Sequence, residues 1–435
     1  PEWMRGASRL TLLDKETTGL LDRFSAVLDP LVIPSYHNAL GVYHLALLPK
    51  KDVPSSLTAA VRREKAMERA AIHFSRGIKQ MESGPASLNR NALALLSALY
   101  LNMAEVTVYW HEPDDSRKYL EKALVTAQEG LLPRYKWRAL AGLGKLKEAL
   151  VVLSRVPLTG AGSGPDEITE TFAPLVHDLI DKEKVEEAFN LLERLSEIER
   201  VHRLKSLVTG LFTTQEKELM ERTYPRLMEI KRLDGEYRNA AEKDKPTLRQ
   251  RLTQEKEIAG SEIGANWERL PSIARISPSE TIREWFVILL GMAFHGEVLA
   301  DRAVEKGPGP EKDQLRKQYD GLTEQFQNAF KKAKSEASNE GEKGIICLLG
   351  PDPIEAIDLM ESLPKGGACL RLIPRNKAGS EETAFSVTQE DLEVVPFRPE
   401  QTPPDPVSGT LTVVALEDPS RLAKRAEQPV ALSAT

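Results

Sequence analysis

The chain contains little cysteine, few aromatic residues and no long hydrophobic run. Cys347 and Cys369 are its only cysteines in 435 residues, which excludes a disulfide framework and favours a reducing compartment, the cytoplasm. The most apolar stretch, residues 285–294, has about half of the ~20 residues that a membrane-spanning helix needs. We therefore expect a buried core helix at these residues and no membrane partner.

An excess of positive charge is also missing. The formal net charge is -6, and the five tryptophans are not interleaved with a basic stripe, so we expect no nucleic-acid partner. Hydrophobic residues make up 41% of the chain and charged residues 29%, a composition that suits a globular protein rich in helix. A chain of this length is expected to form about two to four domains.

Common metal-binding and cofactor-binding motifs are absent from the sequence. No histidine pair has the His-x3-His spacing of a helical zinc site. The seven histidines are instead scattered along the chain: His37, His44, His73, His111, His177, His202 and His295. The glycine-rich residues 158–166 are not followed by the Gly-Lys-Ser/Thr of a phosphate-binding loop, so we expect a loop between repeats. We predict no metal ion and no cofactor.

A recurring helical pattern is present in the first half of the chain. Ala149, Leu153 and Val156 place a small residue and two apolar residues on one helix face, as a close helix crossing requires. The same triad recurs at Ala70, Phe74 and Gly77, at Ser116, Leu120 and Ala123, and at Ala188, Leu192 and Leu195. Ser116 and Ala149 are 33 residues apart, close to the period of about 34 residues in tetratricopeptide repeats (TPRs). The other two intervals between first members, 46 and 39 residues, are longer and indicate insertions.

Apolar–small pairs precede three of these triads on the expected partner helices: Leu40-Gly41, Met103-Ala104 and Leu175-Val176. The third unit is irregular, because Trp137 stands where a small residue is expected. The fold class we predict is mainly α, with a TPR-like α-solenoid of antiparallel helix pairs over residues 1–213 and capping helices at its N-terminal end. An ordinary α-bundle with alanine-rich faces is the alternative.

Two further regions follow the repeats. Residues 214–340 carry long amphipathic patterns that predict a helical hairpin (residues 214–241 and 248–258), the apolar helix near Trp285, and a further helix after the Gly-Pro break at residues 307–310. Their charged faces are expected to face solvent, and a partner-binding coiled coil is the alternative.

Residues 341–435 predict a small α/β region with a helix at 354–363 and strands at 368–374, 383–388, 392–396, 410–416 and 429–432.

This order of regions resembles the bacterial TPR–CHAT proteins, which are caspase-like cysteine peptidases. The resemblance rests on Met360 to Pro364, on the Gly366-Gly367 turn, and on the strand segments 368–373, 385–387 and 392–395. It implies the start of a caspase-like sheet, whereas the expected Asp-Gly and Leu-Pro-Phe words near residues 410–414 are absent. The family uses a His-Cys dyad, and no histidine follows His295. We therefore expect this chain alone to be inactive and both cysteines to be buried small hydrophobic residues with raised pKa values.

The resemblance leaves two main functional interpretations. The chain is either the protein-interaction and regulatory portion of a TPR–CHAT peptidase, which a separate catalytic fragment would complete, or a non-enzymatic TPR adaptor with an α/β appendage. A caspase-like substrate is a weaker third. By register with the triads, Glu105, Arg134, Arg138 and His177 point into the repeat groove, and their mixed charge suggests a polar peptide or protein partner. The alternative is a groove that packs on the chain's own helical hairpin.

Overall fold

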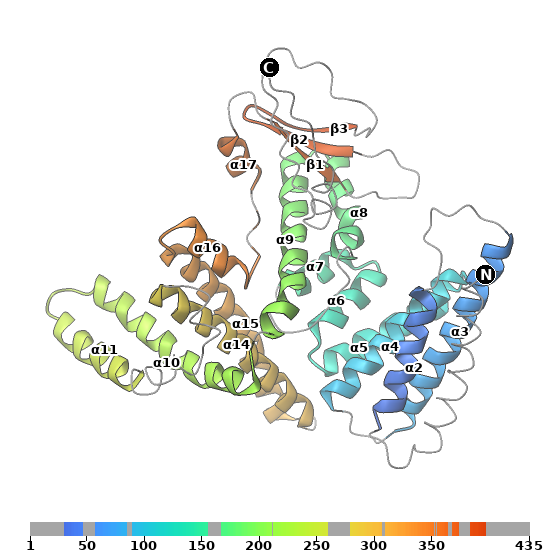
Figure 1. Cartoon of the computed structure of the whole chain (residues 1–435), viewed down its shortest axis with the longest axis horizontal. Coiled ribbons are helices and arrows are strands. Elements are labelled where there is room, and N and C mark those ends of the chain that lie inside the picture. The colour runs from blue at the N-terminus through green and yellow to red at the C-terminus, as the bar shows by residue number, and fades with distance from the viewer. Residues whose placement is uncertain are drawn as a thin grey trace, which may run out of the picture. The chain divides into compact units, whose positions relative to one another are not determined.

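The computed structural model of the chain describes residues 30–46, 57–84, 89–154, 167–210, 212–259, 279–306, 309–351, 353, 355–363, 368–373 and 383–396. The fold is mainly helical with one small sheet, as predicted (Figure 1). It divides into two compact units. Unit 1 comprises Pro1–Gly160 and Met292–Asn328, and unit 2 comprises Ala161–Gly291 and Ala329–Thr435. The boundaries fall inside α14 (Glu280–Glu305) and α15 (Pro310–Glu336).

Unit 1 contains consecutive helices that each pack on the next along the chain. They are α2 (Val32–Ala46), α3 (Leu57–Glu82), α4 (Arg90–Tyr109), α5 (Pro113–Glu129), α6 (Pro133–Gly142) and α7 (Leu146–Ser154). Alternate helices also contact one another, since α2 packs on α4 and α4 packs on α6. The helices α2, α4 and α6 therefore form one row, and α3 and α5 pack against it.

The turns between these helices follow from local sequence. The side chain of Asn89 accepts a hydrogen bond from the backbone nitrogen of Ala92 at 2.9 Å and caps the start of α4. Helices α5 and α6 begin with Pro113 and Pro133, at the position where a missing backbone N–H costs nothing. Gly144 has a φ of 75°, a conformation that glycine adopts without strain, and it turns α6 into α7.

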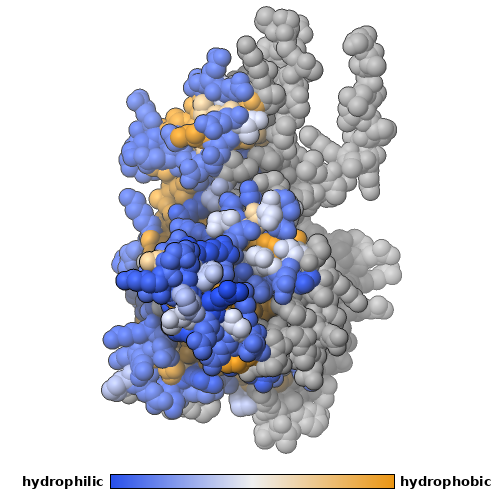
Figure 2. Space-filling model, turned by 90° about the vertical axis from the view of Figure 1, so that its left-hand side faces the viewer, coloured by the Kyte–Doolittle hydropathy of each residue, from blue (hydrophilic) through white to orange (hydrophobic). Residues whose placement is uncertain are grey.

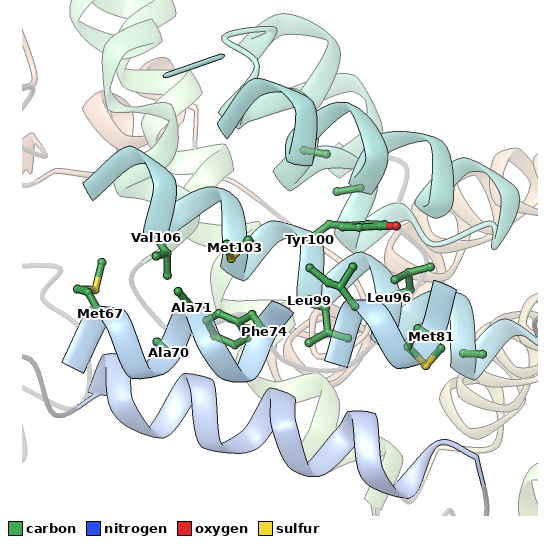
Figure 3. Packing of buried hydrophobic residues seen from close by; sticks show 14 residues of the cluster. Met67, Ala70, Ala71, Phe74, Met81, Leu96, Leu99, Tyr100, Met103 and Val106 are labelled. Carbon is green, nitrogen blue, oxygen red and sulfur yellow. The ribbon is translucent and has the colours of Figure 1, made fainter. Parts of the chain in front are cut away.

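The predicted triads lie in the interior. All triad residues that the structure describes are buried. Val156 lies outside the described residues. The crossing between α4 and α5 is so close that the hydroxyl of Ser116 donates to the carbonyl of Ala104 at 3.2 Å. This contact confirms that Ser116 and Ala104 lie where α4 and α5 cross. Figure 3 shows the neighbouring core, in which Met67 and Ala71 of α3 point toward Met103 and Val106 of α4.

Helix α4 is the one helix within the described ranges that is long and apolar enough to cross a membrane by length and composition. Ten of its residues are buried, and it packs on α3, α5 and α6. Its central place in unit 1 therefore accounts for the apolar residues on its buried side.

The segment Met292–Asn328 completes unit 1. Arg90, at the start of α4, forms ion pairs with Glu297 and Asp301 of α14, and its Nε donates to the carbonyl of Gly130 at 3.2 Å. Burial opposes the charge of Arg90, but the two facing carboxylates outweigh this effect and raise its pKa. Val304 of α14 packs beside a small apolar cluster of Leu93, Ala127 and Leu132.

Unit 2 contains α8 (Glu167–Asp181) and α9 (Val185–Gly210), which pack on each other, and the hairpin of α10 (Thr214–Asn239) and α11 (Lys245–Ala259). The hairpin confirms the prediction for residues 214–258. Thr213 and Glu216 form a capping box at the start of α10. The face shown in Figure 2, on the side where α10 and α11 lie in Figure 1, is mostly hydrophilic. Charged residues such as Arg222, Glu236 and Arg238 are exposed on this hairpin, whereas Glu216 is buried.

The sheet is an antiparallel meander in the order β1-β2-β3, formed by β1 (Ala368–Ile373), β2 (Thr383–Thr388) and β3 (Leu392–Pro396). All three strands lie where the sequence predicts them. The sequence patterns did not predict how these three strands pair, and both described pairings are antiparallel. The predicted elements after residue 396 lie outside the described residues.

Side chains of α9 hold the sheet within unit 2. The rings of Phe189 and Phe385 meet edge to face with centroids 5.5 Å apart. Arg371 of β1 forms an ion pair with the buried Glu193 at 2.6 Å, and the amide oxygen of Asn190 accepts a hydrogen bond from the first residue of α17 (Ala356–Ser362). The remaining helix, α16 (Glu340–Cys347), begins at the cap residue Asn339.

Candidate functional site

The row of α2 and α4 carries an unusual outer surface. The two helices contact each other, and α3 packs on both of them. On α2, Ile33, His37, Gly41 and His44 are buried, whereas the residues on the opposite side are exposed. We call this surface the α2–α4 face, and it consists of Val32, Ser35, Ala39 and Val42 of α2 and Asn91, Ala98, Glu105, Val108 and Tyr109 of α4.

Charge is almost absent from the α2–α4 face. Helix α2 contains no Asp, Glu, Lys or Arg, and α4 contains only Arg90 and Glu105. Several apolar side chains on it are nevertheless exposed: Val32 by 40%, Val42 by 44% and Val108 by 60%. Exposed apolar residues that lie singly need no explanation, whereas a group of them on adjoining helices indicates an interaction site.

The helices on the other side of the row show the opposite composition. Helices α3 and α5 expose dense runs of both signs: Glu64, Lys65, Glu68, Arg69, Arg76 and Lys79 on α3, and Asp114, Asp115, Arg117, Lys118, Glu121, Lys122 and Glu129 on α5. Both sides of unit 1 belong to the same fold and have the same solubility requirement. The two sides of unit 1 therefore differ in charge rather than in the exposure of apolar side chains, since α3 and α5 also expose Val61, Ile72 and Val125.

Three of the residues predicted to line the groove lie in unit 1. Glu105 is exposed on α4, and Arg134 and Arg138 are half-buried on α6. The guanidinium of Arg134 lies 5.4 Å from the ring centroid of Tyr135, and that of Arg138 lies 5.6 Å from Trp137. The start of α6 packs beside Leu93, and Glu105 lies about 18 Å further along α4 at 1.5 Å per residue. Glu105 is therefore well separated from the arginine pair along the row.

The fourth predicted groove residue, His177, is half-buried on α8 and belongs to unit 2. The sequence register placed all four residues on one concave surface. The structure places Glu105 on the α2–α4 face, both arginines on the neighbouring α6, and His177 on α8 of unit 2.

Three histidines that are scattered along the sequence form a cluster beneath the α2–α4 face. His37 and His44 lie two turns apart on α2, and His73 of α3 lies between them. The Nδ1 atoms of His37 and His73 are 3.1 Å apart, and the rings of His44 and His73 stack with centroids 5.6 Å apart. The overlooked signal is the Tyr-His doublet that recurs after seven residues, at Tyr36-His37 and Tyr43-His44.

The two cysteines lie in unit 2 in different surroundings. Cys369 is buried in β1, and burial, with a smaller contribution from Glu193, raises the pKa of its thiol. This confirms the expectation for Cys369. Cys347 is half-buried at the end of α16, so the expectation that it is buried is wrong. Its carbonyl accepts a hydrogen bond from Arg200 at 2.9 Å.

Metal-binding clusters are not found in the described part of the chain, where no group of three or more His, Cys, Asp or Glu side chains has a suitable arrangement. Comparison with known proteins also gives no assignment: no family model, curated protein or solved structure matches the chain. The α2–α4 face and the histidine cluster are therefore the features of unit 1 on which a function can be argued.

Proposed function

We propose that the chain is a protein-interaction scaffold that binds a partner protein through the α2–α4 face. In this proposal the helix pairs of unit 1 stack into a TPR-like superhelix, and α2, α4 and α6 line its binding side. The packing of α2 on α4 and of α4 on α6 supports this arrangement. The observation that carries the proposal is the near absence of charge on α2 and α4 beside the heavily charged α3 and α5.

The partner segment we propose is an amphipathic helix. Ser35, Ala39 and Ala98 have small side chains that allow another backbone to approach, and the exposed valines beside them offer apolar contacts. Helix-in-groove recognition buries the apolar stripe of the ligand in this way. Helix α2 has 15 residues, which corresponds to about 22 Å or four turns of a bound helix. Arg134 and Arg138 on α6 would contact an acidic end of this helix.

A library of helical peptides displayed on phage, selected against the purified chain at pH 7.5, tests the proposal. Selected peptides should share apolar residues at spacings of three and four. Their affinity should fall at least about tenfold in Val42→Glu and in Val108→Glu, since each change buries an uncompensated carboxylate at the interface. Ile72→Glu on α3 and Val125→Glu on α5 are matched controls, because these residues are exposed by 44% and 54% on the charged side.

Peptides that bind all four variants equally well would contradict the proposal, because the binding surface would then lie elsewhere on the chain. The double variant Arg134→Glu/Arg138→Glu tests the polar end of the site, and it should weaken only those peptides that carry an acidic end.

A second candidate function adds regulation of a caspase-like cysteine peptidase to the scaffold role. It is supported by β1, β2 and β3, which lie at the segments on which the TPR–CHAT resemblance rests. In this function a separate catalytic fragment is the partner. Sequencing the intact gene tests it: a downstream His-Gly word and an Asp-Ala-Cys-like word would support the peptidase, whereas a stop codon after Thr435 would favour the adaptor.

A further inference from the structure

The histidine cluster lies at the contact between α2 and α3, where its protonation state bears on helix packing. His37, His44 and His73 are exposed by only 2%, 8% and 3%. At 3.1 Å, the Nδ1 atoms of His37 and His73 are within hydrogen-bonding distance. One of the two nitrogens must therefore carry a hydrogen and the other must accept it.

This geometry limits the number of protons that the folded pair can hold. Two imidazoles have four ring nitrogens, and the shared Nδ1 contact leaves room for only three protons on them, or one positive charge. In the unfolded chain both imidazoles take up a proton below about pH 6.5, giving two positive charges. The ring of His44, stacked on His73, adds a third group whose protonation would place like charges in contact.

The groups around the cluster do not change the proton limit. The rings of Tyr36 and Tyr43 lie beside His37 and His44. On α3, Arg69 and Arg76 precede and follow His73 by about one turn and are both cationic. On α4, Leu99 and Asn102 face α2, with Glu105 one turn further along on the outer face. No neighbour can place a second proton between two nitrogens that are already in hydrogen-bond contact.

We propose that this cluster makes the attachment of α2 dependent on pH, so that α2 separates from α3 and α4 as the pH falls from about 7 toward 5. The open state binds at least one proton more than the closed state, so the stability of the closed state rises with pH. The stabilisation is present above about pH 6.5, where the imidazoles of the unfolded chain are also neutral, and it is lost as the pH falls below that value and the unfolded pair takes up its second proton. Because α2 carries half of the α2–α4 face, acid would also release a bound partner, a consequence that rests on the proposed function.

Hydrogen exchange resolved by helix tests the inference on the full chain without any partner. With intrinsic exchange rates corrected, protection of α2 should fall about tenfold per pH unit for each proton taken up, and so at least tenfold between pH 7.5 and 5.5. Protection of α5, which contains no histidine, should stay constant. In His37→Gln and His73→Gln, the loss of α2 protection should shrink to about threefold or less, because one imidazole of the pair is gone.

His111→Asn is the matched control, since His111 is exposed at the turn between α4 and α5 and its φ of 59° suits asparagine. This variant should keep the wild-type response. If a Gln variant unfolds α2 at pH 7.5, histidine NMR titration of the wild-type chain replaces it, and His37 or His73 should protonate at a lower pH in the folded chain than in the urea-unfolded chain. Unchanged α2 protection at pH 5.5, or equal midpoints of both histidines in the folded and the urea-unfolded chain, would overturn the inference. Loss of α2 protection in a chain that binds no helical peptide would contradict the proposed function alone.

Discussion

Gly41 determines how closely α2 and α3 approach each other. A Cβ atom added at this glycine would lie 2.2 Å from Cε1 of Phe74, far below any real contact distance. Phe74 is itself completely buried, so its ring has no open space into which it could move. The apolar–small pair Leu40-Gly41 of the sequence thus corresponds to a real requirement, because only glycine leaves room for the Phe74 ring.

We expect Gly41→Ala to lower the free energy of unfolding by about 1–3 kcal/mol, the usual cost of overpacking a core. The measurement is urea unfolding followed by circular dichroism. Gly321→Ala is the control, since nothing lies near a Cβ at Gly321 of α15, and there alanine should be neutral or stabilising by up to about 1 kcal/mol. In a Phe74→Leu background Gly41→Ala should cost less, because the two residues interact. An equal cost in both backgrounds would mean that Gly41 does not contact Phe74.

Elements with strong local patterns were predictable, and elements defined by long-range contacts were not. The three strands lie at the predicted positions, because β-branched and apolar residues are bounded there by glycine, proline and polar turns. The α10–α11 hairpin could likewise be predicted from its apolar stripe and from the Asp-Lys-Pro turn. Helix α16 was missed, since it is short and ends in the apolar residues Ile345 to Cys347, which resemble a strand.

The candidate site was predictable only in part, for a similar reason. Glu105, which the sequence register placed in the repeat groove, is exposed on α4; an outward position of this kind can be predicted because register within one helix is a local property. The meeting of His37 with His73, 36 residues apart, depends on the packing of α2 on α3. The missing charge of α2 was visible in the sequence, but its meaning required the knowledge that α4 lies beside it.

At the scale of elements, one polar network joins three long helices of unit 2. The indole Nε1 of Trp285 on α14 donates to the carboxylate of Glu336 on α15 at 2.7 Å. Lys231 of α10 lies 2.9 Å from Glu284 and 3.4 Å from the same Glu336, and its Nζ is 5.3 Å from the indole centroid. Glu336 therefore accepts from a buried indole and also pairs with a largely buried lysine.

We expect Glu336→Ala to destabilise unit 2 by about 1–3 kcal/mol, because it leaves the buried indole N–H without this acceptor. Glu336→Gln should cost less, since the amide oxygen can still accept from Trp285. Glu311→Ala is the control on the same helix. Its ion pair with Lys306 is exposed by 49% and 67%, so its loss should change the stability by no more than about 0.5 kcal/mol. Equal effects of Glu336→Ala and Glu311→Ala in urea unfolding would show that the network adds nothing.

At the scale of the whole molecule, the sequence patterns divide the chain into consecutive regions, whereas unit 1 is assembled from two separate segments. Arg90 and Glu297 are 207 residues apart and still form an ion pair. Neither residue is distinctive in sequence, as each is one charge among many on an amphipathic helix. Such pairing is fixed by tertiary packing, and for this reason local periodicity could identify α14 and α15 but could not assign Met292–Asn328 to unit 1.

The assembly of unit 1 from two separate segments predicts how the chain behaves when it is cut between them. A protease recognition site inserted at residues 158–166, where the sequence predicts a loop, would separate Pro1–Gly160 from Met292–Asn328 covalently. The two fragments should remain together during size-exclusion chromatography, because unit 1 is complete only with both segments. The contacts that hold them are the Arg90 ion pairs, the packing of Val304 beside Leu93 and Leu132, and the bond from Arg316 to the carbonyl of Gln128.

Weakening these contacts should then separate the fragments. In Arg90→Ala, Glu297 loses its cationic partner and the carbonyl of Gly130 loses a donor, so the cut fragments should dissociate at a lower urea concentration than those of the cut wild-type chain. Lys118→Ala is the control, because its pair with Asp115 is exposed within α5 and touches neither segment boundary. Fragments that separate without any denaturant would show that Met292–Asn328 does not belong to the fold of unit 1.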